Sequence, residues 1–168
     1  VDGGEIAVNM GPPSFRDPDL PEPGGGDVAS VDLTVGGESW SGLAVSMGNP
    51  HLVVRAEDDP ASAPLRRIAD AAGRQGGFPH GVNVEVARVA TRGRVDARVW
   101  ERGVGETWAC GSGACAVVAA LGIGGAVGAE VDVHMPGGRL RVAWTGDSKE
   151  SMWLTGPAQR VFSGRYVG

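Results

Sequence analysis

The sequence predicts an α+β fold in which a mainly antiparallel β-sheet curls around a central apolar helix. Most of the chain alternates between apolar and polar residues in short stretches separated by glycine-rich turns, which is typical of paired strands. One helical segment, from about Gly111 to Leu121, is apolar on every side and is therefore expected to be buried. The chain has 168 residues and neither an internal repeat nor a linker, so residues 1–168 are expected to form a single domain.

The first half of the chain is expected to contribute strands and one amphipathic helix. Residues 11–26 hold five of the 11 prolines, which predicts a loop. Gly36-Gly37 predicts a hairpin turn, and the turn Gly48-Asn49-Pro50 leads through His51 into another strand. The expected strands before that turn are Glu5–Met10, Val28–Val35 and Trp40–Ser46.

A helix is expected from Pro64 to Arg74. Its apolar residues recur at the i, i+3, i+4, i+7 spacing of a helix with one buried face. Gly73 or Gly76 is expected to end it.

The second half is expected to surround the central helix with strands. That helix is expected to stop at Gly122, since glycine favours helix ends. The expected strands are Val82–Ala90 and Arg94–Trp100 about Gly93, the hairpin Glu130–Met135 and Arg139–Trp144, and two short closing strands at Ser151–Thr155 and Gln159–Phe162.

Composition narrows the class of protein. The net charge of −5 and the absence of a Lys/Arg run argue against a nucleic-acid partner. No stretch is long and apolar enough to span a bilayer, and the first residues lack the profile of a secretion signal. The two cysteines, five positions apart, are poor disulfide partners, which indicates a reducing compartment. We therefore expect a cytoplasmic protein.

The stretch from Glu101 to Ala120 carries the strongest chemical signal. A helix that begins near Gly111 leaves its first N–H groups unpaired, and these groups attract a carboxylate or phosphate. The same field favours a thiolate at Cys110. Cys115, inside the apolar run, is expected to pack as a small hydrophobic residue. The pattern alone is equally consistent with a structural turn, but as a site it predicts chemistry on a small carboxylate-bearing molecule.

Five separated motifs together resemble the diaminopimelate epimerase family. They are VNMGPP from Val8, SMGNPH from Ser46, NVEVARV from Asn83, ERGVGETWACGSGACA from Glu101 and MPGGRLRV from Met135. The resemblance implies a diaminopimelate-epimerase-like fold of two similar domains, each a sheet wrapped on a central helix, with the active site between them. The chain corresponds to the C-terminal half of that arrangement. It lacks the MCGNG-like motif that carries the partner cysteine, and residues from about 159 to 168 would normally complete the missing N-terminal domain.

The resemblance also implies an activity and a set of site residues. The family interconverts LL- and meso-2,6-diaminopimelate without pyridoxal phosphate or any other cofactor, by proton transfer between two cysteines, in lysine and peptidoglycan precursor synthesis. By resemblance the catalytic residues are Cys110, Glu101 and His51, of which the last two adjust the protonation of the thiols. The α-carboxylate would lie on the amides of Gly111 and Ser112. The residues expected to bind the far end of the substrate are Asn49, Asn83, Glu101 and Arg102. The isolated chain is expected to be inactive.

Other interpretations remain open on the sequence. One is a cysteine-dependent hydrolase or transferase that uses Cys110 with His51, and another is a binding module for a small carboxylate. A third is a different isomerase of the superfamily, proline-racemase-like or phenazine-pathway-like. No metal site is expected, since the histidines and cysteines lack ligand spacing. An apolar surface that normally packs against a second domain is also compatible with a homodimer.

Overall fold

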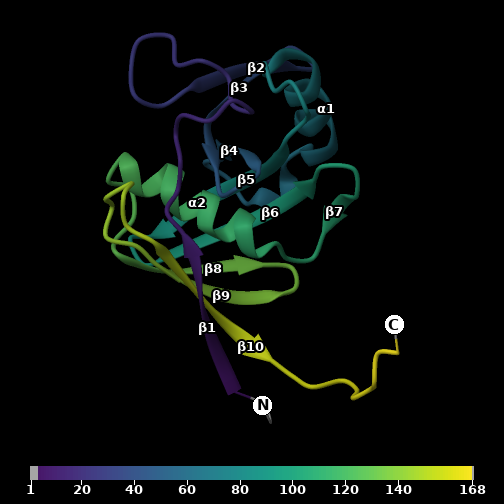
Figure 1. Cartoon of the computed structure of the whole chain (residues 1–168). Helices are drawn as coiled ribbons and strands as arrows, with labels where there is room; N and C mark the ends of the chain where they lie inside the picture. Colours follow the sequence, from purple (N-terminus) through teal and green to yellow (C-terminus); the bar gives the residue numbers. More distant parts are fainter. Residues whose placement is uncertain (1–3, 168) are drawn as a thin grey trace.

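The computed structural model describes residues 4–167, whose strands all belong to one curled sheet (Figure 1). The elements are β1 (Gly4–Gly11), β2 (Ser30–Val35), β3 (Glu38–Ser46), β4 (Pro50–Arg55), the 3-10 helix η1 (Pro60–Ser62), α1 (Leu65–Gln75), β5 (Asn83–Thr91), β6 (Arg94–Glu101), β7 (Gly105–Thr107), α2 (Gly111–Ile123), β8 (Glu130–Met135), β9 (Gly138–Ala143) and β10 (Met152–Ala158). The single-domain expectation extends to residues 1–3 and 168, which lie outside the described residues.

The strand order is β1-β10-β9-β8-β6-β5-β4-β3-β2, and β7 pairs with β6. Neighbouring strands are antiparallel except for two parallel pairs, β4 with β5 and β6 with β8. A parallel pair needs a crossover connection, and each of these crossovers contains one of the α-helices. The mixed, mainly antiparallel sheet with a buried helix confirms the predicted fold class.

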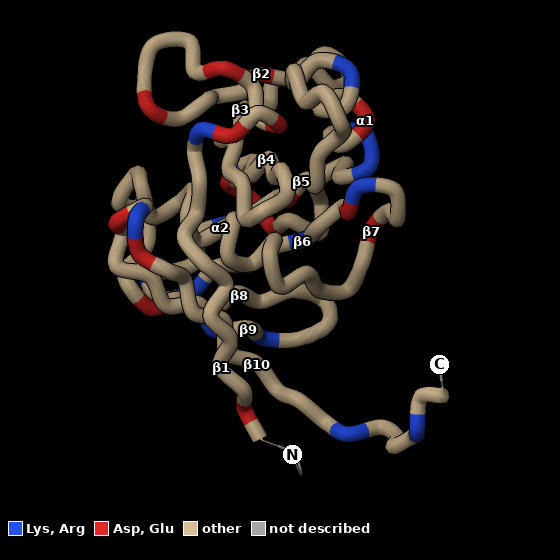
Figure 2. The backbone as a smooth tube through the Cα atoms, in the orientation of Figure 1, with Lys and Arg blue, Asp and Glu red and all other residues tan. Residues whose placement is uncertain are grey.

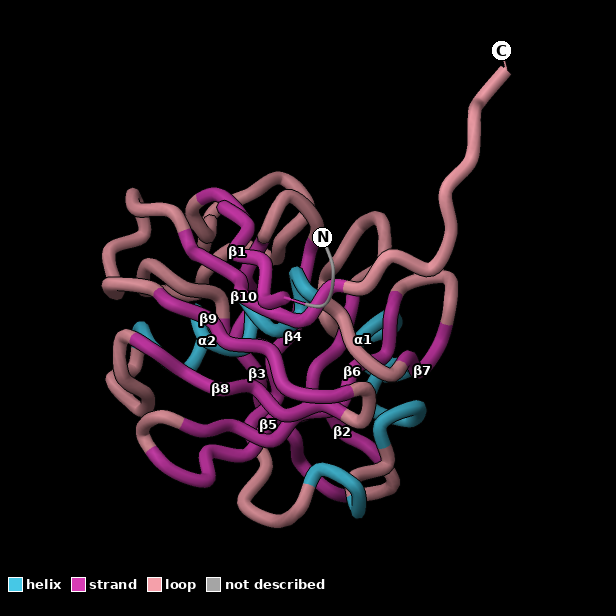
Figure 3. Tube along the Cα trace, turned by 90° about the horizontal axis from the view of Figure 1, so that it is seen from below, coloured by secondary structure: helices cyan, strands magenta, loops and turns pink. Residues whose placement is uncertain are grey.

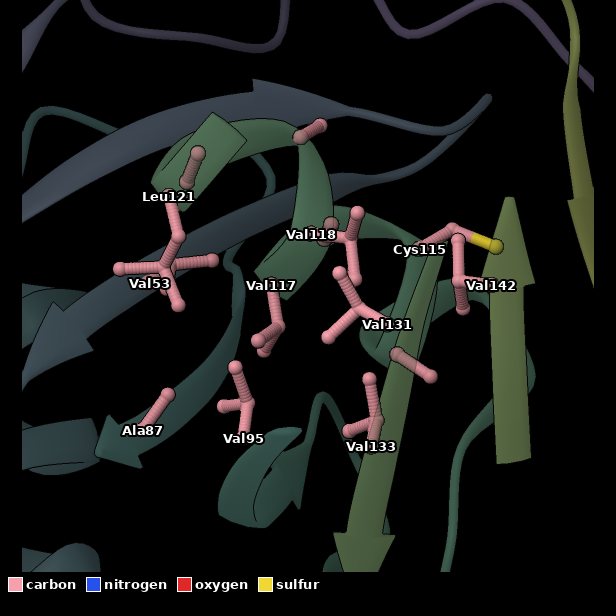
Figure 4. Close-up of a cluster of buried hydrophobic side chains, with 14 of the residues drawn as sticks. Val53, Ala87, Val95, Cys115, Val117, Val118, Leu121, Val131, Val133 and Val142 are labelled. Carbon is pink, nitrogen blue, oxygen red and sulfur yellow. The ribbon is translucent and has the colours of Figure 1, made fainter. Parts of the chain in front are cut away.

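The central helix α2 lies inside the curl of the sheet. Every residue from Gly113 to Leu121 is buried, and the helix contacts β3, β4, β5, β6, β9 and β10. Figure 4 shows Val117, Val118 and Leu121 of α2 among valines that come from the surrounding strands. The side chains from Ala114 to Leu121 are all apolar, so the helix has no polar face to present to water.

The second helix, α1, covers the opposite face of the same strands. In β4, Val53 packs in the core around α2, whereas its neighbours Leu52 and Val54 pack in the core around α1. The middle strands are therefore buried on both faces, which explains their nearly continuous apolar sequence.

Several predicted boundaries differ from the structure. The helix α2 runs to Ile123 rather than stopping at Gly122. The helix α1 is capped by Gly76, one of the two glycines predicted to end it, and Gly73 lies inside the helix. The short strand β7 was not predicted. The predicted strand Gln159–Phe162 is wrong, because this segment has no strand structure and all four residues are exposed. It projects away from the body of the molecule, where no strand lies beside it to supply hydrogen bonds (Figures 1 and 3).

Charged residues are distributed over many elements, with acidic and basic positions interspersed (Figure 2). Among the described residues, neither helix has the length and apolar character that crossing a bilayer would require.

Candidate active site

Cys110 lies at the start of α2, as the sequence predicts. It is the N-cap residue, with extended backbone (φ −138°, ψ 120°), and its sulfur accepts a hydrogen bond from the Gly113 N–H at 3.4 Å. The Ser112 hydroxyl lies 3.4 Å from the same sulfur. Cys110 is half-buried, whereas Cys115 is buried in the core. The thiol of Cys110 therefore lies at the start of α2, whereas the thiol of Cys115 packs in the hydrophobic core.

The electrostatic state of Cys110 differs from the one that a helix start alone suggests. Burial raises the pKa of the Cys110 thiol above its ordinary value, and the carboxyl groups of Glu101 and Glu85 raise it further. The hydrogen bonds from Ser112 and Gly113 lower this pKa but do not reverse the shift. The donors at the helix start therefore favour the thiolate, as the sequence predicts, but desolvation outweighs them and leaves the pKa raised.

The first turn of α2 offers free hydrogen-bond donors. Within residues 4–167, the N–H groups of Gly111 and Ser112 have no protein acceptor, while that of Ala114 already bonds the Cys110 carbonyl. Unpaired amides at a helix start attract an anion. The residues that carry these two amides directly follow Cys110 in the sequence. The amides therefore suit the carboxylate of a ligand whose adjacent carbon atom lies within reach of the Cys110 sulfur.

Glu101 and Arg102 lie at the end of β6, where the chain turns into β7. The Thr107 hydroxyl donates to Glu101 Oε1 across this turn. Arg102 is exposed, and its guanidinium donates to the His80 carbonyl at 2.9 Å. Within residues 4–167 its guanidinium has no carboxylate partner.

Asn83 is buried, and its side chain is bonded to backbone at both ends. Its Nδ2 donates to the Pro50 carbonyl at 3.0 Å, and its Oδ1 accepts from the Arg102 N–H at 2.9 Å. Asn83 thus joins the start of β4 to the end of β6 and positions the Arg102 backbone. Its amide keeps one N–H and one lone pair that these two bonds do not use.

His51 is fully enclosed, and both of its ring nitrogens have partners. Nδ1 lies 2.7 Å from Glu85 Oε1, and Nε2 lies 3.2 Å from Asn49 Oδ1. His51 and Glu85 are each 0% exposed. Asn49 is half-buried at the β3–β4 turn, so it separates His51 from solvent.

Glu85 is a residue that the sequence analysis did not select. Burial raises the pKa of its carboxyl, although His51 lowers it in part. A Cβ atom at Gly113 would lie 2.7 Å from Glu85 Oε1, so the first turn of α2 rests directly on this carboxyl group. The available signal was an acidic residue inside an otherwise apolar stretch of β5, a strand whose first five residues are buried on both faces.

The sheet and α2 bring these residues to one end of the helix. Cys110 and Ser112 come from α2, Glu101 and Arg102 from the end of β6, and the remaining predicted residues from the paired starts of β4 and β5. The parallel register of β4 and β5 places His51 opposite Asn83.

A cavity of about 830 Å³ lies elsewhere, against the C-terminal end of α2, and none of the predicted site residues lines it. The candidate site is the start of α2, because neither a cysteine nor a histidine lines that cavity. Within residues 4–167, no group of three His, Cys, Asp or Glu side chains is arranged to hold a metal ion.

Comparison with known proteins gives consistent relatives. A family model described as diaminopimelate epimerase matches residues 43–161. The diaminopimelate epimerase of Thioalkalivibrio sulfidiphilus is 42% identical over 161 residues, which cover 96% of this chain and 58% of that protein. The diaminopimelate epimerase of Alkalilimnicola ehrlichii is 44% identical over 163 residues, with 97% and 58% covered. The chain therefore spans somewhat more than half the length of the curated relatives it matches.

A solved structure supports the fold. The hydroxyproline epimerase of Agrobacterium vitis aligns with a TM-score of 0.59 and 16% identity, over 93% of this chain and 50% of that one. At this identity the likeness concerns the fold alone.

Proposed function

The chain belongs to the diaminopimelate epimerase family, and from that membership we propose that it forms the C-terminal half of a cofactor-independent enzyme that interconverts LL- and meso-2,6-diaminopimelate. The observation that carries the proposal is the start of α2, where the half-buried sulfur of Cys110 adjoins the free amides of Gly111 and Ser112. The pathway we assign is lysine and peptidoglycan precursor synthesis in the cytoplasm.

Epimerisation without a cofactor requires fixed hydrogen-bond donors near the reacting carbon atom, and the start of α2 supplies such donors. The α-proton of an amino acid is weakly acidic, and without a cofactor ring the carbanion must be stabilised by fixed donors. The amides of Gly111 and Ser112 hold the α-carboxylate and offset its charge as the carbanion develops. Cys110 exchanges the α-proton on one face of the carbon. A thiol on the opposite face completes the inversion, since one base cannot serve both faces.

The raised pKa of the Cys110 thiol favours the direction of the reaction in which Cys110 donates a proton to the carbanion. A protonated Cys110 acts as the acid, delivering a proton to the carbanion while the opposite thiolate removes one. The carboxyl group of Glu101, which accepts a hydrogen bond from Thr107, raises the pKa of the Cys110 thiol, and we assign Glu101 to adjusting the protonation of this thiol.

The far end of the substrate carries a second ammonium and a second carboxylate. We assign the carboxylate to Arg102, whose guanidinium is exposed and can bind it through two N–H groups. Asn49 and Asn83 supply further amide contacts, and Glu101 accepts from the distal ammonium. We assign His51 to adjusting the protonation of the opposite thiol without direct contact, because both of its ring nitrogens are already bonded.

The partner thiol would come from a second domain. The relatives are longer than this chain, which leaves room for such a domain. We propose that residues 159–168 complete it, and that the apolar side chains Ile6, Val8 and Trp153 on the β1–β10 pair face it, since they are between 38% and 47% exposed. The chain alone is then inactive.

The test is exchange of the substrate α-proton with deuterium from the solvent, followed by NMR. The chain joined to the N-terminal segment of a relative should epimerise diaminopimelate, and the chain alone should not. Cys110→Ser in the joined protein should lower kcat by at least about a thousandfold, since it removes one of the two proton-transfer groups. Undiminished turnover by Cys110→Ser would remove Cys110 from the mechanism.

The cysteine hydrolase alternative is less well supported. It needs His51 to take the proton of Cys110, but both ring nitrogens of His51 are bonded elsewhere. Turnover of a thiol-reactive acyl substrate by the chain alone would favour that alternative.

A further inference from the structure

Glu85 is a buried carboxyl group for which the proposed reaction has no assigned use. It lies on β5 beneath the first turn of α2, where only a glycine at position 113 leaves room for it. Its Oε1 is 2.7 Å from His51 Nδ1, while its Oε2 is buried with no hydrogen-bond partner among the described residues. A buried carboxyl group with one unpaired oxygen is costly to retain for packing alone.

The contacts of His51 determine where its protons are. Asn49 Oδ1 is an acceptor only, so the ring nitrogen that faces it, Nε2, carries a hydrogen. A second proton occupies the 2.7 Å contact between Nδ1 and Glu85 Oε1, on one atom or the other. Whichever atom holds it, the Glu85–His51 pair as a whole is neutral. Loss of this second proton would leave an uncompensated charge in the interior.

The same contacts orient Asn49. Because its Oδ1 faces the ring, its NH₂ group is on the other side, and this group donates to no acceptor within residues 4–167. Asn49 is half-buried at the β3–β4 turn, where a ligand could reach it.

We propose that Glu85 is a positioning residue, which acts through His51 to hold Asn49 with its NH₂ group directed into the site. This inference rests on the proposed function, in which Asn49 contacts the substrate. An NH₂ group donates only, so it binds a carboxylate oxygen of the substrate and does not bind an ammonium. Glu85 thereby selects for a negatively charged group at this position.

Two substitutions separate this role from a purely structural one. In Glu85→Gln, the new amide NH₂ donates to Nδ1, which leaves the ring proton on Nε2 and Asn49 unchanged. In Glu85→Met, a side chain of similar length offers no hydrogen bond, so the ring proton is free to move to Nδ1. Glu130→Gln, at the exposed start of β8, is the matched control for a lost acidic group.

The first measurement is the ¹⁵N NMR spectrum of the His51 ring in this chain. We expect a protonated Nε2 in the unsubstituted chain, in Glu85→Gln and in the Glu130→Gln control, and a loss of that signal in Glu85→Met. A bare Nε2 in the unsubstituted chain would overturn the proposal, even if Glu85→Met fails to fold. Identical ring spectra for all four proteins would overturn it as well.

The second measurement is the steady-state rate of the joined protein described above. Glu85→Gln should keep kcat and KM within about threefold of the parent, whereas Glu85→Met should raise KM by up to about tenfold, the value of one hydrogen bond. A large loss of kcat in Glu85→Gln at unchanged KM would overturn the positioning role, because it would mean that the charge of Glu85 takes part in proton transfer. The ring spectra do not depend on turnover, so an inactive parent would contradict the proposed function without deciding this inference.

Discussion

The sulfur of Cys110 shows how opposing local effects decide the chemistry of one residue. The helix start supplies a donor from Gly113, and Ser112 supplies another, yet burial and two nearby carboxyl groups prevail and raise the thiol pKa. For a thiol, a raised pKa lowers the thiolate fraction at any given pH. Cys110 is therefore mostly protonated near neutral pH and gains reactivity only as the pH rises.

We predict that alkylation of Cys110 by iodoacetamide reaches its half-maximal rate above the ordinary thiol value of about 8.5. Ser112→Ala should move the midpoint further up, because it removes a hydrogen bond that lowers the pKa. Peptide mass spectrometry measures the modification at each cysteine. Cys115 is the internal control: it is buried, its pKa is raised to about 12, and it should stay unmodified. A Cys110 midpoint below 8.5 would contradict the balance described here.

Residues differ in how far the sequence could assign them. Cys110, Gly111 and Ser112 could be assigned because a helix start carries its chemistry in consecutive positions. Glu85 could not, since its meaning comes from His51, 34 positions away, and from the helix that covers it. The sequence could not reveal the hydrogen bonds of Asn83 either, because their partners, Pro50 and Arg102, are distant from Asn83 in the chain.

Within the two helices, Gly113 of α2 lies in a crowded position and Gly73 of α1 lies in an open one. Gly113, in the first turn of α2, leaves the space that the Glu85 carboxyl occupies, whereas Gly73, in the last turns of α1, has nothing within 4 Å of an added Cβ. The glycine at position 113 is needed for a close approach, and the one at position 73 only costs helix stability.

We predict opposite effects of alanine at these two positions. Gly113→Ala should lower the free energy of unfolding by about 1–3 kcal/mol, because its methyl group overpacks Glu85. Gly73→Ala should raise the free energy of unfolding by about 0.5–1 kcal/mol through helix propensity. Urea unfolding followed by circular dichroism measures both. Equal and stabilising effects would show that Glu85 does not lie against α2.

On the scale of the whole molecule, one sheet separates two cores. The core around α2 and the core around α1 use alternate residues of the same strands, so β4 and β5 stabilise both. Residues 159–167 take no part in either core: Phe162 is 83% exposed and Tyr166 is 93% exposed. The stability of this domain should therefore not depend on that tail.

We predict that deleting residues 159–168 changes the free energy of unfolding by less than about 0.5 kcal/mol, the usual range for exposed positions. Deleting residues 152–168 is the contrasting variant. It removes β10 together with buried Met152 and leaves β1 without its partner, so it should prevent stable folding. Thermal unfolding of the two truncated chains measures the difference. A large loss on removal of 159–168 would place that segment in the core.

The fold class, the burial of α2, the position of Cys110 at the start of α2 and most of the strands could be predicted from the sequence. They follow from periodicity, turn residues and apolar composition along consecutive positions. The direction of the Cys110 pKa shift, the pairing of His51 with Glu85 and the irregular course of residues 159–167 became known only from the folded chain. Desolvation, hydrogen-bond partners and strand neighbours depend on groups that are distant in the sequence and that the folded sheet brings into contact.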